Sequence, residues 1–292
     1  MTNPLLEVFG YPTDNHSSDA ERLRSNNICP FGNGIPNCTK DRANDPLGVC
    51  SIRSGEDAVI TCPVRFRENW LIAEDAAKFF FEPGTRWTTL KEVRLKDAHG
   101  VSAGNIDVVL VSYDDRGKLI DFGSLEIQAV YISGNIRNPF ARYMSDPVKY
   151  SNLDWSKEKN FPRADFLSSS RKRLAPQLLF KGGILHSWGK KSAVALDRPF
   201  FETLPSLAEV DPSDAEICWM VYDLQKDTDL NKYHLAPHRK VFTKFNESIN
   251  QITIAKPGDI KEFMKLLQSK LDECLDSESV NLNRTVSLED LI

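Results

Sequence analysis

Two polar side chains stand two residues apart within the apolar run SLEIQAV at residues 124–130. Because side chains alternate along a strand, Glu126 and Gln128 would share one face while their neighbours pack on the other. Two further carboxylates precede them, Glu92 in KEVRL and Asp107 in GNIDVVL. Carboxylates that converge on one strand end repel each other unless a hard divalent cation such as Mg²⁺ neutralises them. Such a site can position a phosphate and activate a water, which fits phosphodiester hydrolysis.

These residues require a hairpin to bring them together. The runs IDVVLVSY (106–113) and LIDFGSLEIQAVYI (119–132) predict two strands, and DDRGK between them predicts the turn. The apolar content of both arms indicates central strands that are covered on both faces. KEVRLKD (91–97) is typical of a half-buried strand or of the last turn of a helix. For each acid taken alone, a solvated strand end remains the alternative, whereas desolvating Glu126 and Gln128 without partners would cost several kcal/mol.

A second chemical feature is a cluster of thiols near the N-terminus. Four of the six cysteines, Cys29, Cys38, Cys50 and Cys62, fall in one stretch rich in Gly, Pro and Asn. Four thiols in such a stretch indicate a tetrahedral metal site, which would supply folding energy that the few apolar residues there do not. Free thiols or small buried hydrophobes are the alternative. Cys218 and Cys274 lie in strand-like and helix-like runs and are predicted to be core residues.

The other elements predict a mixed α/β fold. Helices are expected at 18–27, 67–81 and 259–275, with another over 173–188 that breaks at Gly182 and Gly183, and strands are expected at 192–197 and 215–225. We expect residues 1–66 to form a four-cysteine metal-binding module and residues 67–292 to form a second, larger domain.

Charge is distributed unevenly. The net charge is −4, yet residues 133–200 are basic and the segments on either side are acidic. The basic segment is either a solvated, salt-bridged surface or a patch that faces a polyanion. No apolar run approaches the roughly 20 residues that a membrane helix needs, and the N-terminus lacks the pattern of a signal peptide. We therefore expect a cytoplasmic protein without a membrane partner.

The hairpin residues resemble a known nuclease pattern. Asp107, followed by Glu126 and Gln128, is similar to the D-x(n)-E-x-K/Q signature of the PD-(D/E)XK nuclease superfamily, with Ile106 in place of its Pro. Together with the upstream cysteines and Glu92, residues 20–200 resemble the NotI type of restriction endonuclease, which carries an N-terminal four-cysteine iron module. The resemblance implies a PD-(D/E)XK core, in which helices flank a mixed central sheet, beside that small module, and makes residues 67–292 the catalytic and DNA-recognition domain.

The same resemblance implies roles for single residues. Asp107 and Glu126 would be direct Mg²⁺ ligands, and Glu92 would complete a second metal position. Gln128 stands where most relatives have Lys; its amide can orient water and a phosphate oxygen but cannot act as a general base. The four clustered cysteines would bind one structural iron, although thiolate chemistry equally permits zinc.

The substrate implied is double-stranded DNA. Enzymes of this type act as homodimers on palindromes, and the resemblance points to a GC-rich site that is cut in both strands to give 5′-phosphate ends. Guanine offers O6 and N7 acceptors to Arg or Lys, and such donors would come from the basic segment. The candidate DNA contacts are Arg137, Arg171, Arg173, Lys181, Lys190 and Lys191.

Two other functions remain open on the sequence. One is a repair or mobile-element nuclease that uses the same core with less sequence specificity. The other is a DNA-binding protein that is stabilised by metal and does not cleave. The leading interpretation is a Mg²⁺-dependent type II restriction endonuclease.

Overall fold

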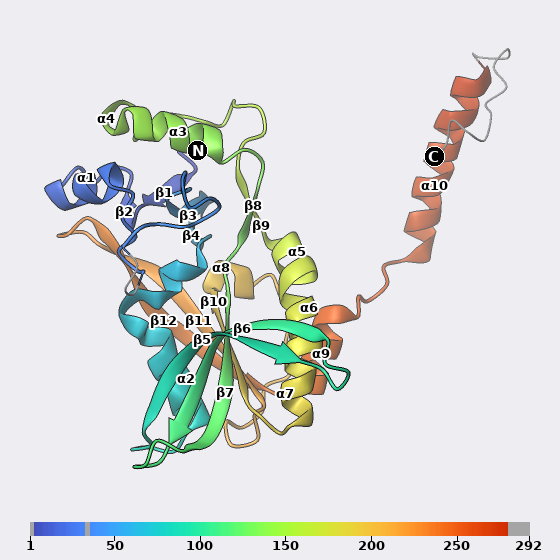
Figure 1. Ribbon diagram of the computed structural model, residues 1–292. Coiled ribbons are helices and arrows are strands. Elements are labelled where there is room, and N and C mark those ends of the chain that lie inside the picture. The colour runs from blue at the N-terminus through green and yellow to red at the C-terminus, as the bar shows by residue number, and fades with distance from the viewer. Residues whose placement is uncertain (1–2, 33–35, 280–292) are drawn as a thin grey trace. The chain divides into compact units, whose positions relative to one another are not determined.

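The computed structural model describes residues 3–32 and 36–279 (Figure 1). The chain divides into two compact units, one that ends at Thr253 and one that begins at Ile254. The second unit contains α10 (Ile260–Ser279), the helix predicted over 259–275. Its large apolar side chains are exposed, among them Phe263 and Leu267. No described helix is long and apolar enough to span a membrane.

A six-stranded mixed sheet with the order β12-β11-β10-β7-β6-β5 is the centre of the first unit. The neighbours of β10 are parallel to it, and the outer pairs are antiparallel. The predicted hairpin is confirmed as β6 and β7, and residues 91–96 of the ambiguous run lie in β5. The strands are β5 (Trp87–Lys96), β6 (Ser102–Tyr113), β7 (Leu119–Gln128), β10 (Ser192–Asp197), β11 (Ile217–Asp227) and β12 (Lys232–Thr243).

Helices cover both faces of this sheet, as the α/β prediction requires. The strand residues Ala193 and Ala195 pack with Ile72 and Ala76 of α2 (Leu71–Phe80) on one face. Val194 and other strand residues pack on the opposite face with the helical segment described below and with α9 (Phe245–Thr253). Burial on both faces explains why the middle of β10, from Ala193 to Leu196, is apolar: a central strand that helices cover on both sides has no solvent-facing side.

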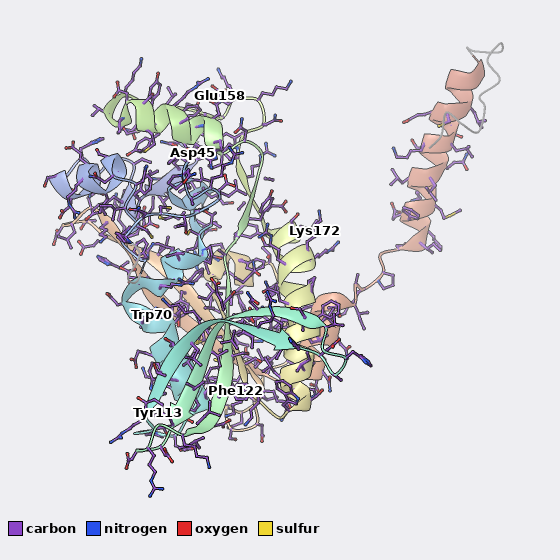
Figure 2. The ribbon with its side chains drawn as sticks, viewed as in Figure 1. Asp45, Trp70, Tyr113, Phe122, Glu158 and Lys172 are labelled. Atoms are coloured by element: carbon purple, nitrogen blue, oxygen red, sulfur yellow. The ribbon has the colours of Figure 1, made fainter. Side chains whose placement is uncertain are left out.

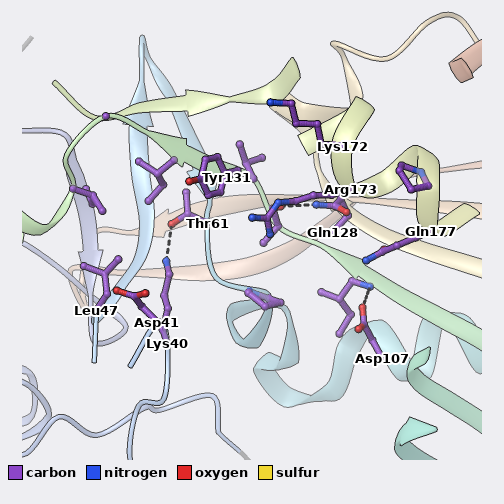
Figure 3. Close-up of a pocket in the computed structure, with 18 of the residues that line it drawn as sticks. Lys40, Asp41, Leu47, Thr61, Asp107, Gln128, Tyr131, Lys172, Arg173 and Gln177 are labelled. Atoms are coloured by element: carbon purple, nitrogen blue, oxygen red, sulfur yellow. Dashed lines mark hydrogen bonds between the residues drawn. The ribbon is translucent and has the colours of Figure 1, made fainter. Parts of the chain in front are cut away.

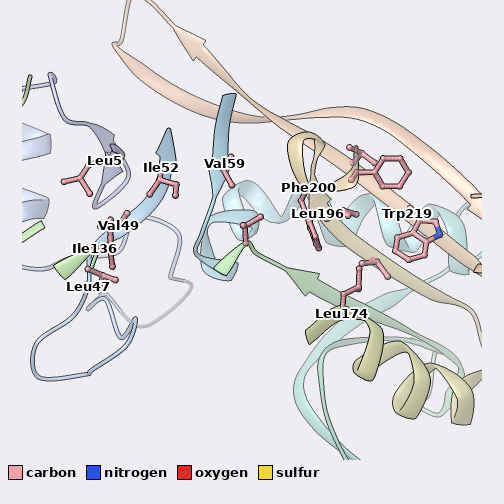
Figure 4. Close-up of a cluster of buried hydrophobic side chains, with 14 of the residues drawn as sticks. Leu5, Leu47, Val49, Ile52, Val59, Ile136, Leu174, Leu196, Phe200 and Trp219 are labelled. Atoms are coloured by element: carbon pink, nitrogen blue, oxygen red, sulfur yellow. The ribbon is translucent and has the colours of Figure 1, made fainter. Parts of the chain in front are cut away.

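The N-terminal residues form a smaller sheet with the order β2-β1-β3-β4. Helix α1 (Ser18–Ser25) is capped by Ser17, whose hydroxyl accepts from the backbone N–H of Ala20. The strands are β1 (Leu5–Val8), β2 (Tyr11–Pro12), β3 (Val49–Ser54) and β4 (Asp57–Ile60). Figure 4 shows Leu5 and Ile52 of this sheet in the same apolar cluster as Leu196 and Trp219 of the main sheet. Residues of the small N-terminal sheet and of the main sheet thus share one apolar core.

A helical segment runs from Phe166 to Ser187 beside the main sheet (Figure 1). It contains α5 (Phe166–Ser169), η2 (Ser170–Leu174), α6 (Ala175–Gln177), η3 (Leu178–Gly182) and α7 (Gly183–Ser187), and η2 and η3 have wide π-type turns. The break predicted at Gly182 and Gly183 is wrong, because both residues keep helical dihedral angles. Gly182 instead allows close packing: a Cβ there would lie 2.9 Å from a ring carbon of Phe245.

Short elements connect these layers. The predicted helix at 67–81 begins later than expected, because Asn69 and Trp70 have positive φ angles and separate η1 from α2. Strands β8 and β9 form a separate antiparallel pair. The remaining elements are η1 (Pro63–Trp70), β8 (Tyr131–Ser133), α3 (Arg137–Ser145), α4 (Pro147–Tyr150), β9 (Arg163–Asp165) and α8 (Arg198–Phe201).

Candidate active site at the end of the central hairpin

The hairpin places Asp107 and Glu126 side by side. In the β6–β7 register Val108 pairs with Leu125, so the next position on each strand brings Asp107 opposite Glu126. Asp107 Oδ2 accepts a hydrogen bond of 2.9 Å from the backbone N–H of Ile127, which fixes the carboxylate at this strand end. The two predicted acids are therefore brought together by strand pairing alone.

Glu126 is buried and its carboxylate is only partly satisfied. Its Oε2 accepts a hydrogen bond of 2.6 Å from the Lys181 ammonium, while Oε1 is buried without a hydrogen-bond partner among the described residues. Burial and, after it, the adjacent charge of Asp107 raise the pKa of Glu126 to about 7, although Lys181 opposes the shift. A buried carboxylate oxygen without a donor, beside a second carboxylate, is the arrangement that a divalent cation would satisfy.

Gln128 lies one step further along the same face of β7. It is 5% exposed, and its Nε2 donates to the carbonyl oxygen of Ala129 at 2.7 Å. Its amide oxygen is left to accept from another group. The two polar side chains of SLEIQAV thus point to the face that carries the helical segment, and Glu126 meets a lysine there.

Glu92 lies on the neighbouring strand at the level of Asp107. The β5–β6 pairing joins Lys91 to Val108 and Val93 to Ile106, and Glu92 stands between these pairs with a φ of 54°. A left-handed backbone is uncommon for a residue with a side chain. Glu92 is exposed and lines a neighbouring cavity that also contains Cys29, Cys38 and Cys62. It is close to the acidic pair in register, but it does not line the cavity that Asp107 lines.

A cavity of about 680 Å³ opens at this strand end. Asp107 and Gln128 line it, and Lys40, Lys172 and Arg173 are cationic groups in its wall. Figure 3 shows Lys172, Arg173 and Gln177 projecting from the helical segment, with Lys40 and Asp41 on the opposite wall. A cavity that combines carboxylates with surrounding cations suits a phosphate chain bound over a metal.

Two of these cations were not among the residues predicted from the sequence. Lys172 lies between two predicted DNA contacts, Arg171 and Arg173, so the basic run SSSRKRLAP carries the signal. Lys40 lies in the cysteine segment, which no charge pattern singles out, and its Nζ donates to the Val49 carbonyl at 2.5 Å. Figure 2 places Lys172 on the helical segment.

A family model described as Restriction endonuclease NotI matches residues 7–235. That span contains the cysteine cluster, the β6–β7 hairpin and the helical segment. The chain belongs to the NotI restriction endonuclease family. It is a site-specific deoxyribonuclease that acts on DNA. No curated protein matches the chain.

The cysteines of this NotI-family chain gather beside the active-site cavity. Burial raises the pKa of the Cys29 and Cys38 thiols, and Cys62 adds to the shift in each case. Burial also raises the pKa of Cys50, with further contributions from Cys62 and Cys29. The four thiols are thus electrostatic neighbours. In the described part of the chain, no group of three or more His, Cys, Asp or Glu side chains already has a geometry that could hold a metal ion.

The donor set of the cysteine cluster nevertheless fits a soft metal. Backbone N–H groups of Phe31 and Gly32 are directed at the Cys29 sulfur, and that of Lys40 at the Cys38 sulfur. Such hydrogen bonds stabilise a thiolate more than a thiol. All four cysteines are free of disulfides.

Two predicted DNA contacts lie near the cavity of the NotI-family enzyme. Arg137 lines it and forms ion pairs with Asp41 and Asp45, which hold its guanidinium against the cysteine segment. Arg173 also lines it, and its guanidinium lies 4.7 Å from the ring centroid of Tyr131. Arg171 is an exposed neighbour on the same helical segment.

The other predicted DNA contacts lie elsewhere. Lys190 pairs with Asp121 near the start of β7. Asp121 precedes Gln128 by seven residues, and a strand rises about 3.3 Å per residue, so this lysine lies far along the strand from the acidic pair. Lys191 lies against Phe79 and lines a separate cavity. Lys181 is 4% exposed and donates to Glu126, so it is buried and does not lie on a surface that DNA could contact.

Proposed function

We propose that the protein is a type II restriction endonuclease that uses Mg²⁺ to hydrolyse phosphodiester bonds in both strands of a GC-rich palindrome. The products would carry 5′-phosphate ends, and the hairpin with its flanking sheet would be a PD-(D/E)XK core. The observation that carries this proposal is the buried, unpartnered Oε1 of Glu126 beside Asp107, at a cavity with cationic walls. A cytoplasmic location belongs to the same proposal.

In this proposal Asp107 and Glu126 hold the cation, and Glu92 on the next strand would complete a second position. When bound, Mg²⁺ would supply positive charge for the phosphate and lower the pKa of a nearby water. Water attacks phosphorus, the bond from phosphorus to the 3′ oxygen breaks, and the 3′ oxygen gains a proton. The phosphate remains on the 5′ side, which accounts for the expected ends.

The remaining cavity residues would bind and orient the substrate. Lys172, Arg173 and Lys40, which line the cavity, would neutralise phosphates of the bound DNA. Gln128 has no group that could take a proton at ordinary pH, so its amide would orient the water or a phosphate oxygen. Arg137 is proposed as a donor to guanine edges in the major groove.

Two further parts of the proposal concern assembly. A palindromic site has two-fold symmetry, so a homodimer that gives one active site to each strand matches it. The cysteine cluster would hold one iron, with zinc as the chemical alternative, in a structural role. The donor set and the N–H groups at Cys29 and Cys38 support that role.

Incubation of plasmid DNA with the purified protein and Mg²⁺ tests the function. Discrete fragments with 5′-phosphates support restriction, a smear would indicate a less specific repair or mobile-element nuclease, and intact DNA would indicate a binding protein. The variants Asp107→Ala and Glu126→Ala should lower the cleavage rate by roughly a thousandfold or more, because each removes a ligand of the metal. DNA binding in Ca²⁺ should persist.

Asp115→Ala is the matched control for these variants. Asp115 is an exposed aspartate in the turn of the same hairpin, where it pairs with Arg86. The control should cleave at the wild-type rate. If Asp107→Ala cleaved equally well, the site assigned here would be wrong. Sequencing of the product ends would then give the recognition site and the position of the cut.

A further inference from the structure

The active-site face of β7 lacks a cation of its own. Glu126 and Asp107 bring two carboxylates together, and the next residue on that face, Gln128, is neutral. Positive charge must then come from another element, because two adjacent carboxylates in a buried site are mutually destabilising.

The structure supplies this charge from the helical segment. Lys181 in η3 extends across β6, and its Nζ lies 2.6 Å from Glu126 Oε2. The same ammonium donates to the carbonyl oxygen of Asn105 at 2.8 Å. The side chains of the ion pair are 5% and 6% exposed, so water does not screen the interaction.

Local features of both elements fit this path. A Cβ on Gly104 would lie 3.7 Å from the Lys181 stem, an ordinary van der Waals contact, so the lysine runs directly over this position of β6. On the helical segment, Arg173 and Gln177 line the cavity at four-residue steps before Lys181. One face of the segment therefore presents three successive side chains to the site.

We propose that Lys181 is a positioning residue for the cleavage reaction. Its ammonium holds Oε2 of Glu126 and leaves Oε1 for the cation, and it provides the positive charge that residue 128 does not. This inference rests on the proposed function. Lys181 was predicted from the sequence as a DNA contact, and here it acts on DNA only through the carboxylate that it holds.

The decisive experiment compares Lys181→Met, Lys181→Arg and the double variant Lys181→Met/Gln128→Lys with the wild type. Single-turnover cleavage of plasmid DNA in Mg²⁺ is measured together with Mn²⁺ affinity by calorimetry and with thermal unfolding. Lys118→Met, an exposed lysine in the β6–β7 turn, is the matched control. It should behave as the wild type in all three measurements.

Lys181→Met should lower the cleavage rate at least a hundredfold, because Glu126 loses the group that orients it. Mn²⁺ should bind severalfold more tightly, since a competing cation has been removed from the carboxylate. A variant that had merely lost its structure would bind Mn²⁺ more weakly. Lys181→Arg should keep a tenth or more of the activity, and the double variant should regain at least tenfold over Lys181→Met.

Several results would overturn the inference. One is cleavage by folded Lys181→Met within threefold of the wild type. Another is a double variant that unfolds at the wild-type temperature but cuts no faster than Lys181→Met. If Lys181→Met does not fold, the double variant alone tests the inference. The lysine introduced at position 128 of β7 must then restore both folding and cleavage, and failure to restore them would overturn the inference. Failure of the wild type to cut DNA would instead refute the proposed function.

Discussion

The carboxylate of Asp197 accepts a hydrogen bond of 2.7 Å from the backbone N–H of Ile60. Asp197 ends β10 of the main sheet and Ile60 ends β4 of the N-terminal sheet, so this bond joins the two sheets. The same side chain caps α8 by accepting from Phe200 N. Burial raises the pKa of Asp197 to about 7, although both backbone N–H groups favour the charged form.

This pKa predicts a specific pH dependence of stability. Because the pKa in the folded state lies above the unfolded value of about 3.9, the contribution of Asp197 is complete below that value and is lost as pH rises through 7. Asp197→Asn removes the titration. The free energy of unfolding of the wild type, relative to this variant, should fall by on the order of 2–4 kcal/mol between pH 4 and pH 8. Urea titrations of both proteins at both pH values, followed by circular dichroism, would measure this change. If the free energy of unfolding changed equally with pH in the wild type and in Asp197→Asn, the prediction would be contradicted.

A second connection between the sheets involves a buried arginine. Arg65 pairs with Glu7 at 3.1 Å and with Glu68 at 2.6 Å, and it donates to the Tyr233 carbonyl at 2.9 Å. Arg65→Met would leave Glu7 buried and uncompensated, so the free energy of unfolding should fall by about 3–5 kcal/mol. Chemical denaturation measures this change, and Arg53→Met, with a more exposed arginine on β3, is the control. Equal stability of the two variants would show that the buried network contributes nothing.

The sequence predicted those parts of the fold that depend on local pattern. Alternation and a turn motif located the β6–β7 hairpin, and strand pairing then placed Asp107 beside Glu126 as expected. The run SAVALD likewise predicted β10, because a strand that is buried on both faces is mainly apolar. These features need no information from distant residues.

What the sequence could not reveal depends on packing between distant segments. Lys181 stands 55 residues after Glu126, and only the approach of η3 to β6 shows that it is buried in the site. The two glycines after it indicated a helix break, whereas Gly182 actually accommodates the Phe245 ring. Lys40 lines the cavity because the cysteine segment folds back toward the hairpin. The spacing of residues in the sequence does not predict such contacts between distant segments.

Metal content gives a direct prediction for the cysteine cluster. If Cys29, Cys38, Cys50 and Cys62 share one ion, a serine at any one of them should greatly reduce the bound metal and lower the melting temperature by several degrees or more. Elemental analysis of the purified protein would also decide between iron and zinc. Cys218→Ala is the control, since that thiol is buried in the main sheet and should leave the metal content unchanged. Full metal loading of Cys50→Ser would remove that residue from the ligand set.

DNA affinity distinguishes the cations around the cavity from those at the other end of the sheet. Lys172 and Arg173 line the active-site cavity, whereas Lys191 lines a separate one. In Ca²⁺, Lys172→Met and Arg173→Met should each weaken DNA binding and reduce the slope of log K against log salt by about one, because one phosphate contact is lost. Lys191→Met should leave both the affinity and the slope unchanged.

Fluorescence anisotropy over a salt series measures these slopes with one labelled duplex. The comparison is well matched, because all three substitutions remove one positive charge and insert the same side chain. A change of slope confined to Lys191→Met would place the DNA over the other cavity. In that case the carboxylates of Asp107 and Glu126 would lie away from the phosphate chain, and the proposed catalytic site could not reach its substrate.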